Sequence, residues 1–191
     1  VIRRRVAEMA AFFGMETWFR KKTSELSGGQ KQMLNLASVM AMSPKLLILD
    51  EPTSMLDPLA ARSLLDTVER INRELGVAVL LTEHRLDAVF PVCDRVLVMY
   101  LGVVEMGTKA QIYGHPAHPY TGALLSAVPE VTETGMPDKP ILEGKIPSPL
   151  NVPTGCRFHT RCPYATEKCA REVPPLRDLG DGHRCACFYD F

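Results

Sequence analysis

Apolar residues follow two patterns along the first part of the chain. One is a helical period, and the other is the short unbroken run that is typical of buried strands. Apolar side chains recur every three or four residues where a helix with one buried face is expected. These helical stretches are 2–13, 31–42 and 58–75. Unbroken apolar runs at 46–49 and 77–81 favour strands covered on both faces, as in a parallel sheet flanked by helices, with the second strand expected to reach Thr82. The remaining expected elements are a hairpin of strands 96–99 and 102–105 and a short helix at 107–113.

The longest predicted helix has a clear start and a clear stop. Asp57 followed by Pro58 is typical of an N-cap with proline in the first helical position, and Gly76 is expected to end the helix. Its expected buried face consists of Leu59, Leu64, Leu65, Val68 and Ile71. Helices alternating with buried strands predict an α/β fold.

Two adjacent carboxylates, Asp50 and Glu51, follow the strand predicted at 46–49. Ligands of open α/β sheets lie beyond the carboxyl ends of the strands, where Asp50 could hold Mg²⁺ on a nucleotide. Glu51 could then orient or deprotonate an attacking water. A solvated Asp-Glu turn after a buried strand is the alternative, and this segment alone does not separate the two.

The segment Leu26–Gln30, with the sequence LSGGQ, precedes the predicted helix 31–42. Ser27 is a natural N-cap, and Gly28 and Gly29 would let the backbone approach a ligand closely. The free N–H groups and positive dipole end of the following helix favour an anion such as phosphate. Taken alone, the segment also fits an ordinary loop that leads into a helix.

The order and spacing of four segments resemble those of ATP-binding-cassette (ABC) ATPases. By this resemblance, Leu26–Gln30 is the family signature, Asp50 and Glu51 belong to the Walker B motif, Ser54–Asp57 is the D-loop and His84 is the switch histidine. The resemblance implies a partial P-loop NTPase cassette, with a parallel-sheet core and the remnant of a helical subdomain. Glu83 departs from the pattern, because many relatives have Thr directly before this histidine.

The same resemblance implies ATP and Mg²⁺ as cofactors and assigns roles to individual residues. Glu51 and His84 are the expected catalytic residues, and Asp50 is the expected Mg²⁺ ligand. The residues expected to bind the nucleotide are Ser27, Gly28, Gly29, Gln30, Asp50 and Asp57.

Composition limits the other classes of function. The 191 residues are 46% hydrophobic, enough for one compact domain and a smaller appendage, and the 22 basic residues balance the 22 acidic ones. This balance gives no electrostatic case for nucleic acid, and no apolar run reaches the roughly 18 residues that span a bilayer. The sequence contains no GxxxxGK[ST] loop and begins at Val1. We therefore expect the C-terminal part of a longer subunit, with negligible ATP hydrolysis on its own.

Proline and cysteine become frequent after residue 114, which predicts a division into 1–114, the cassette part, and 115–191, a small loop-rich module. His118–Pro129, HPYTGALLSAVP, and Ile146–Ala165 resemble the C-terminal extension of oligopeptide and dipeptide importer ATPases. This resemblance implies uptake of oligopeptides or dipeptides as the function of the complete subunit.

Four cysteines of this module have the spacing C-x5-C-x6-C-x17-C. They are Cys156, Cys162, Cys169 and Cys187. Four thiolates suit tetrahedral Zn²⁺ or an Fe–S cluster, and a module poor in apolar residues would need a metal for stability. Resemblance to peptide importers favours a [4Fe–4S] cluster over Zn²⁺, while free thiols remain open. Cys185 is treated as a spare, and His159 and His183 are alternative zinc ligands.

The importer resemblance also implies partners and a location. The expected partners are a second ABC ATPase subunit, two transmembrane permease subunits and, indirectly, an extracytoplasmic peptide-binding protein. The expected location is the cytoplasmic face of the cell membrane, as a peripheral protein. Two alternatives remain open: the ATPase of an energy-coupling-factor vitamin importer, which residues 25–54 and 80–99 also resemble, and a metal-binding interaction or regulatory module without ATPase activity.

Overall fold

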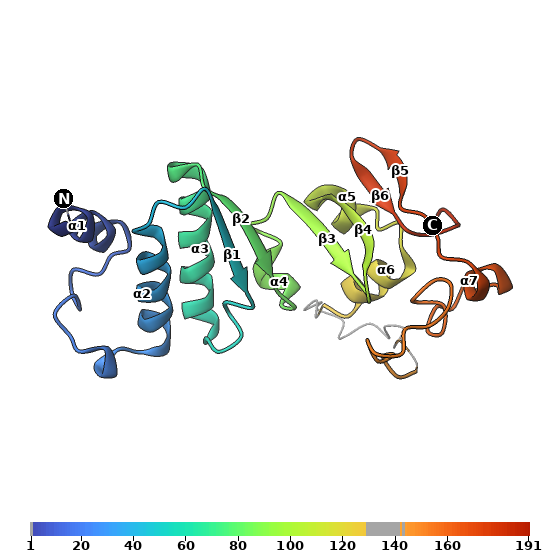
Figure 1. Cartoon of the computed structure of the whole chain (residues 1–191), viewed down its shortest axis with the longest axis horizontal. Helices are drawn as coiled ribbons and strands as arrows, with labels where there is room; N and C mark the ends of the chain where they lie inside the picture. Colours follow the sequence, from blue (N-terminus) through green and yellow to red (C-terminus); the bar gives the residue numbers. More distant parts are fainter. Residues whose placement is uncertain (1, 129–141, 143) are drawn as a thin grey trace, which may run out of the picture. The chain divides into compact units, whose positions relative to one another are not determined.

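The computed structural model describes residues 2–128, 142 and 144–191, so Pro129, at the end of the HPYT segment, lies outside the described residues. The chain divides into two compact units, residues 1–92 and 93–191, which Figure 1 shows in the order of the sequence. The sequence predicted a boundary between the cassette part and the C-terminal module after residue 114, which lies within the second unit. That boundary stays a prediction.

The first unit contains a two-stranded parallel sheet and four α-helices among its described residues. Its elements are α1 (Ile2–Phe12), the 3₁₀ turn η1 (Thr23–Glu25), α2 (Gly28–Met40), β1 (Leu46–Asp50), α3 (Pro58–Leu75), β2 (Ala78–Thr82) and α4 (Leu86–Val89). Strands β1 and β2 pair in register from Leu46 opposite Ala78 to Asp50 opposite Thr82. Helix α3 therefore crosses between two parallel strands whose carboxyl ends lie side by side (Figure 1).

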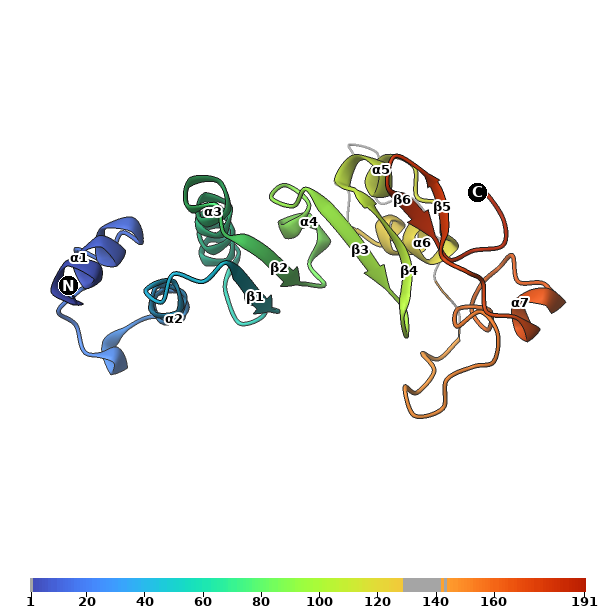
Figure 2. The same ribbon diagram turned by 45° about the horizontal axis from the view of Figure 1, so that its top comes forward.

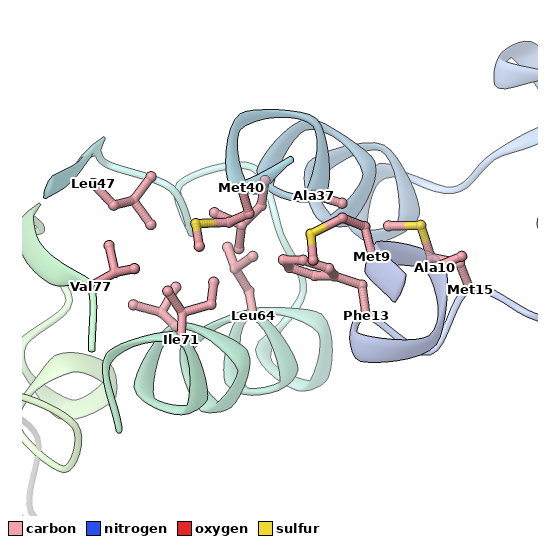
Figure 3. Close-up of a cluster of buried hydrophobic side chains, with 12 residues drawn as sticks. Met9, Ala10, Phe13, Met15, Ala37, Met40, Leu47, Leu64, Ile71 and Val77 are labelled. Atoms are coloured by element: carbon pink, nitrogen blue, oxygen red, sulfur yellow. The ribbon is translucent and has the colours of Figure 1, made fainter. Parts of the chain in front are cut away.

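The core of the first unit lies where α1, α2, α3 and β1 meet. Figure 3 shows its apolar side chains, among them Phe13, Met40, Leu47, Leu64 and Ile71, pointing toward one another. Arg5 adds a polar link between the helices, because its guanidinium donates to the carbonyls of Met40 and Ala41 at the C-terminus of α2. Helix α1, which precedes the signature segment, thus packs against α2, which begins within it.

The expectation that the strands are covered on both faces is wrong for the described residues. Leu47 is buried against α2 and α3, but Ile48 is 63% exposed and Leu80 is 56% exposed. Successive side chains of a strand point to opposite faces, so one apolar face of this sheet packs on the core and the other does not. An unbroken apolar run shows that both faces are suited to burial, but it does not supply the element that buries them.

The predicted N-caps Ser27 and Asp57 are both confirmed. Asp57 Oδ1 accepts hydrogen bonds from the N–H groups of Leu59 and Ala60, both at 3.0 Å, and Gly76 ends α3 in the left-handed conformation with φ 66°. Helix α2 begins at Gly28, earlier than its apolar pattern suggested, because Ser27 caps it. The buried face of α3 is as predicted except for Leu59, which is 81% exposed in the first turn.

The second unit contains a four-stranded antiparallel sheet. Its elements are β3 (Arg95–Met99), β4 (Val103–Thr108), α5 (Lys109–Gly114), α6 (Pro119–Ser126), α7 (Glu167–Arg171), β5 (Arg177–Gly180) and β6 (His183–Cys185). The strand order is β3-β4-β6-β5, and Figures 1 and 2 both show β6 beside β4. The predicted hairpin is confirmed, but β4 runs on to Thr108, whose side chain caps α5. The C-terminal segment thereby joins the sheet that the hairpin begins.

Aromatic side chains dominate the core of the second unit. Phe158 is 1% exposed and lies with its ring centroid 5.2 Å from that of Tyr100 and 5.3 Å from that of Tyr120. These residues come from the end of β3, from α6 and from the loop that carries the cysteines.

The helices of residues 2–128, 142 and 144–191 include none with the length and hydropathy of a membrane span.

Candidate functional site

The acidic pair predicted from the sequence lies at the carboxyl end of β1, beside the end of β2. The hydroxyl of Thr82 donates a hydrogen bond to Asp50 Oδ1. The Glu51 N–H donates to the carbonyl of Thr82 at 3.0 Å. Glu51 has φ 42°, a conformation that non-glycine residues seldom adopt. The hydrogen bond from its N–H to the carbonyl of Thr82 in β2 holds the backbone in this conformation.

His84 and Glu51 approach each other at this edge. Nδ1 of His84 lies 3.6 Å from Oε1 of Glu51, and the two side chains are 65% and 54% exposed. The parallel pairing of β1 and β2 brings them together although they are far apart in the sequence. A carboxylate and an imidazole that share one open edge are suited to handling a water molecule and its proton.

The signature segment forms the N-terminus of α2 and has a structural role of its own. The Gln30 N–H donates to Ser27 Oγ at 3.2 Å, and the Ser27 N–H donates to Gln30 Oε1 at 3.0 Å. This reciprocal capping box fixes the start of the helix. The side chain of Gln30, which is predicted to bind the nucleotide, therefore also takes part in the cap of α2.

The two signature glycines differ in their surroundings. A Cβ at Gly29 would lie 3.2 Å from the Cβ of Ala60 in the first turn of α3, whereas a Cβ at Gly28 would meet open space. Gly29 thus permits close packing of the start of α2 on the first turn of α3, the helix that Asp57 caps. Gly28 is the signature glycine whose backbone is open to a ligand.

The four cysteines predicted as ligands line one pocket of the second unit. Cys156, Cys162, Cys169 and Cys187 share this pocket with aromatic side chains, which include Phe158, Tyr164, Tyr189 and Phe191. The Cys156 N–H donates to the carbonyl of Cys169 at 2.7 Å. Gly155 makes this approach possible, because a Cβ there would lie 2.3 Å from the same carbonyl oxygen.

Burial changes the pKa of three of these thiols. It raises the pKa of Cys156, Cys162 and Cys187 above the usual value, and negative charge on neighbouring cysteines of the same group raises each further. The thiols are thus near enough to influence one another. Among the described residues, however, no group of three or more His, Cys, Asp and Glu side chains is arranged to hold one metal ion.

Cys185 and His183 do not line this pocket, whereas His159 does. Cys185 is fully buried outside the pocket, and its burial, followed by the charge of Glu105, raises its pKa to about 12. His159 Nδ1 lies 2.8 Å from the carbonyl of Cys156, and His183 pairs with Glu105. Each histidine therefore has a local hydrogen-bonding partner in the chain.

Glu105 organises a buried polar network that was not expected from the sequence. Its carboxylate is 0% exposed and accepts hydrogen bonds from the N–H groups of Ala117 and His118, at 2.8 and 3.0 Å. His183 Nε2 lies 2.8 Å from Oε1 of the same group. A glutamate placed between apolar residues of a strand was the available signal, but the sequence did not identify its partners.

Two family descriptions match separate parts of the chain. "ABC transporter" matches residues 2–54, and "Oligopeptide/dipeptide transporter, C-terminal region" matches residues 104–169. The first range contains the signature segment and the acidic pair. The second contains the HPYT segment and three of the four pocket cysteines.

Curated relatives match across most of the chain. It is 41% identical over 167 residues to a putative peptide import ATP-binding protein of Brucella ovis, which covers 87% of this chain and 53% of the relative. It is 41% identical to the di/tripeptide transport ATP-binding protein DppF of Pseudomonas aeruginosa, covering 98% of this chain and 58% of the relative. It is 38% identical to the oligopeptide transport ATP-binding protein AppF of Bacillus subtilis, covering 96% and 57%. The chain thus spans little more than half the length of these relatives.

Solved structures with a similar fold are ATP-binding cassettes. The cbiO1 protein of Clostridium perfringens, described as part of the ABC transporter complex cbiONQ, aligns with a TM-score of 0.57 and 36% identity over 60% of this chain and 46% of its own. The ADP conformation of MJ1267, an ATP-binding cassette of an ABC transporter, aligns with a TM-score of 0.52 and 26% identity, covering 57% and 44%.

Proposed function

We propose, from the premise that this chain belongs to the ATP-binding subunits of ABC transporters of the oligopeptide/dipeptide-importer type, that the complete protein hydrolyses ATP to drive the uptake of oligopeptides or dipeptides. One observation carries the hydrolysis: Glu51 and His84 face each other at 3.6 Å at the end of the parallel strands, beside Asp50. The peptide cargo is supported by relatives named for peptide import, which match up to 98% of the chain.

In this proposal the three side chains at the sheet edge divide the work. Asp50 provides a carboxylate for Mg²⁺, which would neutralise phosphate charge when bound, and the Thr82 hydroxyl orients that carboxylate. Glu51 accepts a proton from the attacking water. His84 holds the water and the terminal phosphate in line with Glu51. The exposure of Glu51 and His84 leaves room for a nucleotide at this edge.

The N-terminus of α2 acts on a different nucleotide in this proposal. Ser27, Gly28 and Gly29 contact the terminal phosphate of ATP held by a second ATP-binding subunit. Gln30 and Asp57 are the further proposed nucleotide-binding residues, and they also cap α2 and α3. The open surroundings of Gly28 and the capped helix N-terminus support this role. Two subunits would then complete each other's sites.

The remaining partners follow from the family. We propose that two transmembrane permease subunits bind the ATPase pair at the cytoplasmic face of the membrane, with an extracytoplasmic peptide-binding protein as the indirect partner. Nucleic acid is not a proposed partner, because 22 basic and 22 acidic residues leave no net charge.

We further propose that Cys156, Cys162, Cys169 and Cys187 hold a [4Fe–4S] cluster, with Zn²⁺ as the alternative. The position of all four thiols around one pocket supports a group that they bind together. Thiolates are usual ligands of both Fe–S clusters and structural zinc, so the four cysteines could hold either group.

Uptake by the reconstituted transporter tests the proposed function. Vesicles that contain the permease subunits and the complete ATPase subunit are expected to accumulate labelled di- and oligopeptides when ATP is supplied, and to stop when Glu51→Gln is introduced. Uptake of a vitamin or metal ion in place of peptides would contradict the cargo. ATP hydrolysis without any dependence on Glu51 would contradict the mechanism.

A further inference from the structure

Glu83 and Thr53 form a partly buried contact beside the candidate catalytic pair. Oε1 of Glu83 accepts a hydrogen bond from the Thr53 N–H at 2.9 Å and another from the Thr53 hydroxyl at 2.6 Å. Thr53 is 0% exposed. Hydrogen bonds to an ionised group are stronger than neutral ones, and exclusion of water strengthens them further. Thr53 is therefore fixed to the residue that directly follows β2.

Two backbone hydrogen bonds stabilise the turn between β1 and α3 around Thr53. The Ser54 N–H donates to the carbonyl of Glu51 at 3.1 Å, and the Leu56 N–H donates to the carbonyl of Thr53 at 3.1 Å. Thr53 is two residues from Glu51, and Glu83 is directly bonded to His84. A shift of this contact would thus move both members of the catalytic pair relative to each other.

Two consecutive residues at the end of β2 hold this turn at different points. Thr82 contacts Asp50 and the N–H of Glu51, whereas Glu83 contacts Thr53. The Thr82 contacts hold the backbone at the start of the turn, and the Glu83 contact prevents the middle of the turn from lifting away. Glu51, which has the unusual φ, lies in the chain between Asp50 and Thr53, the residues that these contacts hold.

We propose that Glu83 is a positioning residue that sets the placement of Glu51 relative to His84 by holding Thr53. The proposal rests on the proposed ATP hydrolysis for its functional consequence, while the contact itself stands on the structure. Small misplacement of reacting groups lowers rates strongly even when substrate binding is kept.

The unpaired oxygen of Glu83 provides a sharp test of hydrogen bonding against charge. Oε2 of Glu83 is buried and has no hydrogen-bonding partner in the described part of the chain. In Glu83→Gln the amide nitrogen can take the place of Oε2, and the remaining oxygen can accept both bonds from Thr53. Glu83→Ala removes both acceptors. Thr53→Val removes only the hydroxyl donor, and Thr53→Ser keeps it.

Hydrogen exchange of the complete subunit tests the contact without any activity. Loss of a hydrogen bond to a charged acceptor is expected to lower the protection of the Thr53 amide about tenfold or more in Glu83→Ala. Glu83→Gln, which keeps a neutral acceptor, is expected to lower the protection less than Glu83→Ala does, and the surface control Glu74→Ala is expected to keep the protection of wild type. Unchanged exchange at Thr53 in Glu83→Ala would overturn the proposal. If that variant does not fold, Thr53→Val, which removes the hydroxyl donor and keeps the N–H bond, is expected to lower the protection by a smaller factor than Glu83→Ala, and Thr53→Ser is expected to keep it.

ATP hydrolysis by the complete subunit tests the consequence. Glu83→Ala is expected to lower kcat about 10- to 100-fold with KM for ATP changed less than about threefold, and Glu83→Gln is expected to restore kcat. A normal kcat in Glu83→Ala, with lost protection at Thr53, would overturn the positioning role. If the wild-type subunit hydrolyses no ATP while Thr53 protection depends on Glu83, the proposed function fails and the contact stands.

Discussion

The two compact units place their key carboxylates in opposite surroundings. In the first unit the side chain of Glu51 is 54% exposed at the end of a sheet and is positioned through its backbone and its neighbours. In the second unit Glu105 is 0% exposed and is itself the acceptor that joins β4, the start of α6 and β6. An exposed carboxylate can be replaced at little cost in stability, whereas a buried acceptor leaves its donors unpaired when it is removed.

This contrast separates chemistry from stability within one chain. The first unit holds its candidate catalytic side chains at an edge that ligands can reach. The second unit uses polar groups to fasten a C-terminal segment that has few apolar residues of its own. Substitutions in the two regions are therefore expected to change different measurements.

The largest expected effect is on catalysis in the first unit. Glu51→Gln in the complete subunit is expected to lower kcat for ATP hydrolysis about 10²- to 10⁴-fold, because a positioned general base contributes a factor of that size. The melting temperature is expected to change little, since the side chain is half exposed. Steady-state hydrolysis and thermal unfolding of the same preparation measure both. Equal losses of activity and of stability would contradict the contrast.

A large effect on stability is expected from the second unit. Glu105→Ala is expected to destabilise that unit by about 3 kcal/mol or more, because the donors of Ala117, His118 and His183 lose their buried acceptor. Hydrogen exchange of the amides in β4 and β6 measures the change in the complete subunit. Glu172→Ala, at an exposed position of the same unit, is the matched control. Protection that is the same in both variants would show that the network is not required.

The stability of the second unit is also expected to depend on pH through His118. Burial, opposed in part by the charge of Glu105, lowers the pKa of His118 from 6.5 to about 4. The unfolded chain therefore takes up a proton at higher pH than the folded chain, and stability present above pH 6.5 is lost as pH falls toward 4.

Replacement of His118 sharpens this prediction. His118 Nδ1 accepts a hydrogen bond from the Tyr120 N–H at 3.1 Å, and asparagine can cap the helix in the same way. His118→Asn is expected to flatten the pH dependence of α6 and β4 protection in that window. An unchanged dependence in the variant would assign the titration to another group.

The smallest expected effect is on a helix cap in the first unit. Asp57→Ala removes the acceptor for the N–H groups of Leu59 and Ala60 and is expected to cost about 1 kcal/mol. Asp57→Asn keeps an acceptor and is expected to cost less. Chemical denaturation of the complete subunit compares the two. If Asp57→Asn abolishes ATP hydrolysis at unchanged stability, Asp57 contributes more than a cap.

Local chemistry made much of the first unit predictable. Asp57, Pro58 and Gly76 act within a few residues of their own positions, so the sequence predicted the bounds of α3 correctly. The apolar runs likewise identified β1 and β2. The exposed face of Ile48 and Leu80 was not predictable, because a run of apolar residues does not indicate how much covering structure is present.

Within the candidate site, the residue types were predictable and the contacts that hold them were not. The order of LSGGQ, the acidic pair and His84 identified the residues, but the Glu83–Thr53 contact required the turn to fold back onto the end of β2. The resemblance even marked Glu83 as a departure without showing its partner.

The sequence by itself determined which residues could carry chemistry and where the helices begin and end, because caps, turns and periodic apolar faces depend on neighbours in the chain. Only the tertiary structure decided which of these residues meet. The pairing of β1 with β2 brings His84 to Glu51, and the pairing of β4 with β6 brings His183 to Glu105. Such contacts join positions far apart in the sequence, and their geometry is set by the strand register, which no single segment specifies.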